Sequence, residues 1–197
     1  MSSPGLRELK KQKTRWAIQE HALRLIAQQG YDATTVEQIA AAAEISPSTF
    51  FRYFKTKEDV IVEDEYDPMF VELFAAAPAG DSPISTLRHA IRAAFAQMQP
   101  ADREKLLARS KLVMSVPALR ARNFENLLPT IRLIAQSLAG RLGRPADDLD
   151  VQALAGACIG AVLPALFTWV ESDGTEDLAE LLDRALAVLE GLSLEPL

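Results

Sequence analysis

The sequence predicts an all-α protein with a small N-terminal three-helix domain and a larger C-terminal helical domain. Apolar residues recur at helical spacing in nearly every long segment, and no run of alternating β-branched residues suggests a strand. Capping residues and helix breakers separate these segments. The chain has 197 residues, 49% of them apolar, so it can bury a core without disulfides or structural metals.

The first predicted helix spans about residues 7–29. Ile18, Ala22 and Ile26 follow the i, i+4, i+8 spacing that gathers apolar side chains on one helix face. Gly30 comes directly after the last periodic residue and suits the left-handed position that ends a helix. The helix therefore offers one apolar face to a small core.

Two short helices are predicted next, separated by a tight turn. Thr35 and Gln38 have the spacing of a capping box, which begins the first of them. Ser46 as N-cap and Pro47 at the first helical position begin the second. The two helices span about residues 36–43 and 47–53.

The charge of the chain is unevenly distributed. The net charge is −6, which by itself argues against a nucleic-acid partner. Residues 1–57, however, hold nine Lys and Arg against five Asp and Glu, a net charge of +4, and residues 58–197 carry −10. Two short helices in a basic region after a longer helix form a helix-turn-helix arrangement, whose second helix enters the major groove of DNA.

The rest of the chain predicts longer helices. Thr56 caps the next one, with carboxylates in its first turn. Pro129 and Pro164 fall inside helical patterns, so we expect kinks or breaks there. The predicted helices span about residues 57–75, 83–98, 101–114, 117–142, 148–171 and 176–192.

The composition excludes several classes of site. Cys158 is the single cysteine, which rules out a disulfide framework and a zinc site built on several thiolates. The two histidines, His21 and His89, lie far apart, and the sequence contains no common catalytic signature. We therefore expect no enzymatic activity, no cofactor and no metal site. The basic N-terminus lacks the apolar core of a signal peptide, which favours a cytoplasmic location.

Four ordered segments carry a specific resemblance. They read GYDATTV at 30–36, IA at 39–40, ISPSTFFRYF at 45–54 and KEDV at 57–60. Together they closely resemble the N-terminal domain of TetR-family transcriptional regulators, with a match over about residues 12–60. The total length and the all-α remainder also suit that family.

The resemblance implies an architecture and a function. Residues 1–60 would form a helix-turn-helix DNA-binding domain with a basic tail, and residues 61–197 a helical ligand-binding and dimerisation domain. The homodimer would form through helices 148–171 and 176–192. The family's common mode is repression at a palindromic double-stranded DNA operator, relieved by a small-molecule effector.

Two positions depart from the family's common pattern. Glu44 stands at the turn position where the family usually has Gly, so the turn must tolerate a less favourable backbone. Phe51 stands where the family often has a Tyr whose hydroxyl reaches a phosphate, and Phe cannot make that contact. Phosphate binding must then depend more on other groups.

A second resemblance concerns the effector. The FFRYF segment at 50–54, PALRAR at 117–122 and LGRP at 142–145 are similar to an actinobacterial-type branch of the family. Some members of that branch are thought to sense acyl-CoA-like molecules. The expected effector is therefore a small apolar or acyl-type compound.

The residues expected to face DNA lie on or beside the second short helix. Ser46 to Arg52 occupy its first turns, and Arg52 alone can make a bidentate contact with guanine. Tyr53, Lys57 and Thr35 suit phosphates better, and Thr35 can also simply cap its helix. Phe50, Phe54 and Ile45 are expected in the core of the small domain. The full DNA-facing set is Thr35, Ser46, Ser48, Thr49, Arg52, Tyr53 and Lys57.

The effector pocket is expected among apolar residues of the second domain, where aromatic and Met side chains suit an adaptable site. Each of these residues also suits the hydrophobic core. Arg88, His89, Arg92, Arg120 and Arg122 can pair with an anionic group or act as surface charge. The candidate lining is Phe70, Phe74, Phe95, Met98, Met114, Phe124, Leu128, Cys158 and Phe167.

The stretch 151–170 contains no charged residue and includes the Gly156-x-x-x-Gly160 motif. Its length fits a membrane span. Gln152 and Pro164 lie within it, acidic residues flank it, and no Lys- or Arg-rich loop adjoins it. We therefore expect a buried helix of a soluble protein, with its small residues at the dimer seam and no membrane partner.

Overall fold

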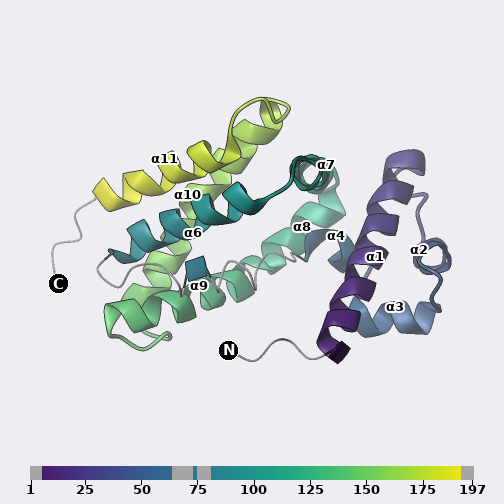
Figure 1. Cartoon of the computed structure of the whole chain (residues 1–197), viewed down its shortest axis with the longest axis horizontal. Helices are drawn as coiled ribbons and strands as arrows, with labels where there is room; N and C mark the ends of the chain where they lie inside the picture. The colour runs from purple at the N-terminus through teal and green to yellow at the C-terminus, as the bar shows by residue number, and fades with distance from the viewer. Residues whose placement is uncertain (1–5, 64–72, 75–80, 192–197) are drawn as a thin grey trace. The chain divides into compact units, whose positions relative to one another are not determined.

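Every regular element that the structure describes is an α-helix (Figure 1). The computed structural model describes residues 6–63, 73–74 and 81–191. The predicted all-α class is confirmed. The chain forms two compact units: the first comprises Met1–Asp64 with Leu112–Asn123, and the second comprises Glu65–Lys111 with Phe124–Leu197.

The first unit is built around the predicted N-terminal helices. Ile18 and Ala22 of the first helix are fully buried, as the i, i+4 pattern predicted, and they pack with Phe50 and Phe54. Leu119 belongs to the same core although it comes from a distant part of the sequence. The helices of residues 1–64 are α1 (Leu6–Gln29), α2 (Val36–Ala42), α3 (Pro47–Tyr53) and α4 (Asp59–Val62).

Local capping sets the ends of these helices. Gly30 has a φ of +87°, the left-handed conformation expected after the last residue of α1. The side chain of Thr35 accepts the N–H of Gln38, and Gln38 returns a bond to the N–H of Thr35, which confirms the capping box. Ser46 caps α3 through the N–H of Thr49, with Pro47 in the first turn.

The predicted helix 57–75 is not formed as one element. Helix α4 spans only Asp59–Val62 and ends at Glu63, whose backbone is extended; residues 64–72 lie outside the described part, and residues 73–74 are helical. The predicted Thr56 cap is present as a reciprocal pair: Thr56 Oγ1 accepts the N–H of Asp59, and Asp59 Oδ2 accepts the N–H of Thr56. The capping pattern was therefore correct.

The second unit contains most of the remaining helices. Two of them are shared, because the last residues of α7 and most of α8 belong to the first unit. The helices are α6 (Pro83–Gln97), α7 (Pro100–Ser115), α8 (Pro117–Glu125), α9 (Leu127–Leu142), α10 (Leu149–Glu171) and α11 (Leu178–Gly191).

The predicted helical span 117–142 is divided into two helices, and the break expected at Pro129 lies just before it. Helix α8 ends at Glu125, and α9 begins at Leu127 after Asn126. Pro129 explains the break, because its ring would clash with the carbonyl of the residue four positions earlier, which is Glu125. Pro129 instead lies in the first turn of α9, where no donor is needed.

Pro164 does not divide its helix. Helix α10 runs without interruption from Leu149 to Glu171, although Pro164 cannot donate to the carbonyl of Gly160. The other side of this helix is well packed: α10 lies against α9 and α11, and α11 also packs on α6. These tertiary contacts stabilise the helix where its backbone bonding is incomplete.

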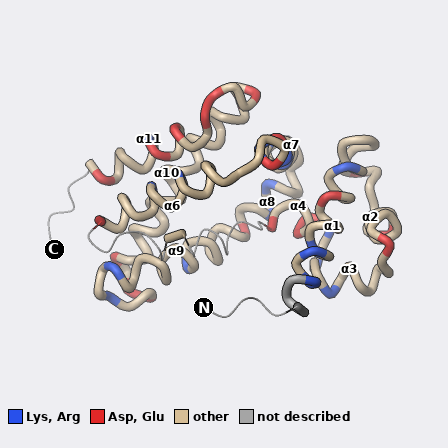
Figure 2. Tube along the Cα trace, in the orientation of Figure 1, with Lys and Arg blue, Asp and Glu red and all other residues tan. Residues whose placement is uncertain are grey.

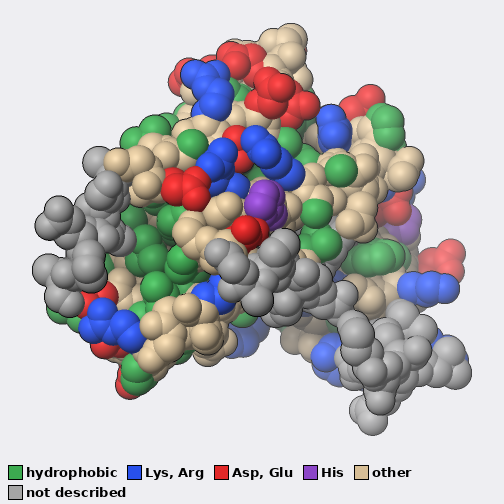
Figure 3. All heavy atoms as spheres, turned by 60° about the vertical axis from the view of Figure 1, so that its left-hand side comes forward, with side chains coloured by type: hydrophobic (Ala, Val, Ile, Leu, Met, Phe, Trp, Pro, Cys, Tyr) green, Lys and Arg blue, Asp and Glu red, His purple; other side chains and the backbone are tan. Residues whose placement is uncertain are grey.

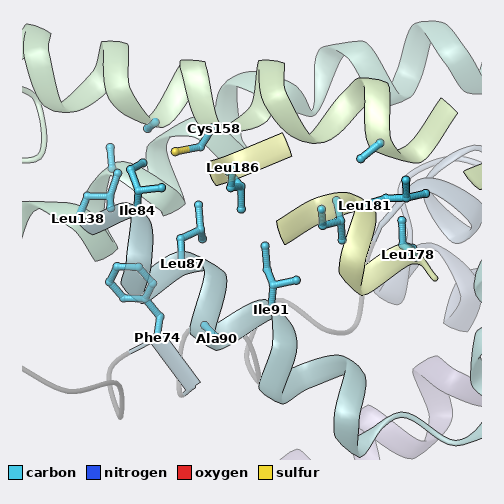
Figure 4. Packing of buried hydrophobic residues seen from close by; sticks show 14 of the residues in the cluster. Phe74, Ile84, Leu87, Ala90, Ile91, Leu138, Cys158, Leu178, Leu181 and Leu186 are labelled. Carbon is cyan, nitrogen blue, oxygen red and sulfur yellow. The ribbon is translucent and has the colours of Figure 1, made fainter. Parts of the chain in front are cut away.

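The second unit has one continuous apolar core among the residues described. Phe74, Leu87 and Leu186 are almost completely buried in it, together with Cys158 (Figure 4). Helix α10 is long and apolar enough to cross a membrane by length and composition alone, and 22% of its most apolar window is buried in the protomer. The helix that was expected to be buried, with small residues at the dimer seam, is therefore only partly covered within one protomer.

Candidate functional site

Helix α3 presents a polar face opposite a single buried anchor. Phe50 is fully buried and faces the core of the first unit. Ser48 and Arg52 are four residues apart, so they lie on one side of the helix, away from Phe50, and both are exposed. Arg52 is therefore on the exposed side of the helix that was expected to enter the major groove. This is the geometry that a base-reading residue requires.

The small hydroxyls at the start of α3 bind one another. Ser46 Oγ lies 2.9 Å from Ser48 Oγ and 2.9 Å from Thr49 Oγ1. It also accepts the N–H of Thr49 at 3.1 Å. The hydroxyl cluster therefore fixes the helix start, and the side chains that extend furthest from the exposed side of α3 are the larger ones.

The turn between α2 and α3 contains the expected backbone departure. Glu44 has a φ of +55°, a left-handed conformation that is unfavourable for a residue with a side chain. The turn is closed by hydrogen bonds from the N–H of Glu44 to Ala41 O and from that of Ile45 to Ala40 O. The missing Gly is therefore accommodated by the turn without a change of its left-handed geometry.

Lys57 ties two loops of the first unit together. Its Nζ donates to the carbonyl oxygens of Tyr31 at 2.9 Å and Thr34 at 3.0 Å, and it lies 3.8 Å from the centre of the Tyr31 ring. The Tyr31 hydroxyl donates to the Glu58 carboxylate. Burial and the neighbouring Glu58 raise the pKa of Tyr31. Lys57 therefore has a structural role. Its ammonium has three N–H donors, and the two carbonyl bonds use two of them.

The segment at the start of α1 is basic and exposed. Lys10, Lys11 and Lys13 are exposed, and Figure 2 shows the basic positions at this end of the helix. Arg15 is held inside the unit, because it donates to the carbonyl of Tyr53 at 3.2 Å and lies 4.3 Å from the centre of the Phe54 ring. The three lysines add positive charge that suits contacts with DNA phosphates.

A buried ion pair joins α4 to the segment Leu112–Asn123. Asp59 is 0% exposed, and its Oδ1 accepts the Nε–H of Arg122 at 2.6 Å. From the sequence, Asp59 was expected only as a first-turn carboxylate and Arg122 only as a candidate cation. No local signal joins the two, although Leu119, which precedes both arginines of PALRAR, is fully buried.

The predicted effector residues lie in several environments. Phe74 and Cys158 are buried in the core of the second unit, and Phe95 packs against that core. Burial raises the pKa of the Cys158 thiol to about 11. Of the others, Met98 caps the end of α6, Met114 lies in the first unit, Phe70 is outside the described residues, and Phe124, Leu128 and Phe167 are exposed.

Two of the arginines considered for an anionic ligand, Arg88 and Arg92, share an acidic partner. Asp183 of α11 is 7% exposed and accepts bonds from Arg88 and from Arg92. The bond from Arg88, with a smaller contribution from Arg92, lowers the pKa of Asp183. Figure 3 shows basic and acidic side chains mixed on one face of the molecule. Arg88 and Arg92 therefore brace α6 against α11.

Helix α10 carries an exposed stripe of uncharged residues. The residues recur every three or four positions, so they share one face. On helix α11, Leu178, Leu181, Leu182 and Leu186 are buried within the protomer. Those leucines are therefore unavailable to a partner. The stripe on α10 consists of Leu149, Ala153, Ala157, Gly160, Pro164 and Phe167.

Known protein families match both parts of the chain. Residues 18–63 match bacterial regulatory proteins of the tetR family, and residues 81–192 match the MftR C-terminal domain. Among the residues described, no group of His, Cys, Asp and Glu has the arrangement of a metal site.

Individual relatives are similar over most of their length. The HTH-type transcriptional regulator TcmR of Streptomyces glaucescens is 34% identical over 154 residues, covering 75% of this chain and 68% of TcmR. The regulator MftR of Mycobacterium tuberculosis is 29% identical over 175 residues, covering 87% of each chain.

A solved structure of similar fold contains a ligand. FadR of Thermus thermophilus, a TetR-family repressor crystallised with lauroyl-CoA, superposes with a TM-score of 0.59 and 28% identity, over 93% of this chain and 97% of FadR. FadR of Bacillus subtilis with stearoyl-CoA has a TM-score of 0.54 and 23% identity over 88% of this chain and 96% of its own, and shows the shared fold.

Proposed function

The chain belongs to the TetR family of bacterial regulatory proteins, and we propose that it represses transcription from a palindromic operator until a small apolar or acyl-type molecule releases it. It is a transcriptional regulator and not an enzyme. We place it in the cytoplasm, where its DNA would be. Residues 1–60 are assigned to DNA binding and residues 61–197 to effector binding and dimerisation.

The observation that carries the DNA-binding assignment is the orientation of α3. Arg52 and Ser48 point away from the buried Phe50, so a duplex can approach them without displacing the core. Arg52 reads guanine, because only its fork can bind two acceptors of one base. Ser46, Ser48 and Thr49 contact base edges, and Thr35, Tyr53 and Lys57 position the phosphates.

The dimer is proposed to form on α10. A soluble monomer rarely exposes a continuous apolar stripe, and the residues from Ala153 to Pro164 are small enough to let two helices approach closely. A two-fold axis places the same stripe of both copies in contact. Val188 of α11, which is 63% exposed, is a further apolar residue that a partner could cover. The two recognition helices would then be spaced about one duplex turn apart, ~34–36 Å.

The effector is proposed to bind in the second unit. The lauroyl-CoA bound to FadR of Thermus thermophilus, at 28% identity, makes a fatty acyl thioester the first candidate. The core around Phe74, Leu87 and Cys158 offers apolar surface that suits an acyl chain (Figure 4). Arg88 and Arg92 are engaged by Asp183, so other groups would meet the charged end of such a ligand.

Coupling is proposed to pass through α7 and α8. Leu112–Asn123 is part of the first unit, but it is continuous with the α7 residues before Leu112 and with Phe124 onward, which belong to the second. A ligand that displaces these helices would pull on Asp59 through Arg122. The start of the predicted helix 57–75, which carries Lys57 and α4, would move with it. Only a ligand that favours the misspaced conformer releases DNA.

Fragment capture followed by titration tests this function. The full-length protein selects genomic fragments, and fluorescence anisotropy measures binding to each of them at several salt concentrations. We expect a pseudo-palindromic site, tight binding that weakens with salt, and release by lauroyl-CoA but not by CoA alone. Equal binding to operator and random duplex would contradict the proposal.

A further inference from the structure

A large apolar side chain stands on the exposed side of α3. Phe51 is 52% exposed, although its neighbours Phe50 and Phe54 are buried. The core of the first unit is complete without it, so packing does not explain an aromatic residue here. An exposed ring on an element that is assigned to DNA binding instead suits a contact with the nucleic acid.

The position of the ring is fixed. The Phe51 ring meets the Phe50 ring edge to face, with centroids 5.5 Å apart and an interplanar angle of 86°. Since Phe50 is fully buried, it holds the edge of Phe51 against the helix. Pro47 and Ser48 lie four and three positions earlier, so they share this side of α3. The ring therefore contacts Phe50 and lies on the side of α3 that also carries Ser48.

The polar side chains near Phe51 do not supply an apolar contact with a base. Ser46 Oγ is bonded to the hydroxyls of Ser48 and Thr49, which reduces their freedom to search for base edges. Arg52, next to Phe51, supplies the charge-assisted contact, and it also brings the duplex to this face. The apolar ring beside Arg52 favours an apolar partner on the base. If the ring covered a hydrogen-bonding atom of a base, that atom would lose its water and gain no new hydrogen bond.

We propose that Phe51 recognises thymine in the operator through the 5-methyl group. Thymine alone presents an apolar group among the base edges of the major groove, and Phe contact with it is an established form of direct readout. Phe51 also lacks the hydroxyl that would direct a Tyr to a phosphate. The inference rests on the proposed DNA-binding function and adds a specificity-determining residue to it.

Removing the thymine 5-methyl group tests the proposed contact with Phe51 directly. An operator is selected from random duplexes with the full-length protein, and each thymine is then replaced by deoxyuridine, which removes only the methyl. We expect one symmetry-related position to weaken binding about fourfold per half-site, the effect of burying one such group. Replacing this thymine by deoxyuridine in both half-sites should weaken binding about fifteenfold.

Variants assign the effect to Phe51. Phe51→Ala should bind the thymine and deoxyuridine operators equally, whereas Phe51→Leu and Phe51→Tyr should keep part of the preference. Arg52→Ala is the matched control on α3: it should weaken both operators but keep their ratio. Circular dichroism checks the folding of each variant. Because Phe51 is half-exposed, we expect its variants to be folded.

Two results overturn the inference while leaving the proposed function intact. The first is selective operator binding with no thymine whose methyl matters. The second is a methyl effect that is the same size in wild type and in Phe51→Ala. Failure of the wild-type protein to select any duplex would instead contradict the proposed DNA-binding function.

Discussion

Arg122 donates its Nε–H to Oδ1 of Asp59 over 2.6 Å, although 63 residues separate the two in the sequence. The other carboxylate oxygen accepts the N–H of Thr56, so one buried side chain binds both the backbone just before α4 and a residue of α8. A polar side chain with no exposure needs such hydrogen-bond partners. The pair therefore makes the segment Leu112–Asn123 a structural part of the first unit.

Removing this partner should destabilise the first unit. Arg122→Gln leaves the Asp59 carboxylate buried without its counter-charge, and we expect the free energy of unfolding to fall by about 3 kcal/mol in chemical denaturation. Arg120→Gln makes the same chemical change at an exposed position of α8 and should cost less than about 0.5 kcal/mol. Equal effects of the two variants would contradict the role of the pair.

The dimer can be tested with a single introduced charge. Ala157→Glu places a carboxylate in the middle of the exposed stripe on α10, where a partner helix would bury it. Light scattering should give a dimer for the wild type at micromolar concentration and a monomer for this variant. Ala108→Glu, at an exposed position of α7, should remain dimeric. A monomeric wild type would refute the proposed interface.

Residues that contact bases and residues that contact phosphates should be distinguishable by comparing binding to the operator with binding to random duplex. Arg52→Ala should weaken binding to the operator by about 1–3 kcal/mol and affect random duplex much less. Lys57→Ala should weaken binding to all sequences alike and lower the salt slope by about 1. It should also destabilise the fold, because the carbonyls of Tyr31 and Thr34 lose their donor. If Arg52→Ala weakens both duplexes equally, Arg52 contacts phosphate.

The single thiol reports on the core of the second unit. The pKa of Cys158 is raised to about 11, so at pH 8 the buried thiol is protonated and should react with a thiol reagent far more slowly than in the unfolded chain. The folded state holds this proton more tightly, so stability should fall as pH rises from about 9 to 11. Rapid labelling of the native protein at pH 8 would show that the core is open.

Local signals in the sequence predicted the first unit well. The caps at Thr35 and Ser46 and the turn at Gly30 depend on a few adjacent residues, and the structure confirms them. The left-handed Glu44 followed from the position of a missing glycine. The DNA-facing assignments remain predictions, and the exposure of Ser48 and Arg52 is compatible with them.

Long-range features could not be read from periodicity. The pairing of Asp59 with Arg122 depends on which distant helix packs against α4, and neither residue differs locally from a surface charge. The same limit applies to α11: helix 176–192 was assigned to the dimer interface, and helical spacing could not show that its leucines pack against α6 and α10 of the same chain. The break before α9 lay within one turn of Pro129, which the sequence did mark.

Reciprocal linkage between operator and effector tests the central claim most directly. Lauroyl-CoA is titrated by calorimetry into the protein alone and into its operator complex, and operator affinity is measured with and without lauroyl-CoA. We expect operator to weaken ligand binding by the same factor by which ligand weakens operator binding, within the roughly 5–150-fold range of such couplings. An affinity for lauroyl-CoA that operator leaves unchanged would contradict its role as the releasing effector.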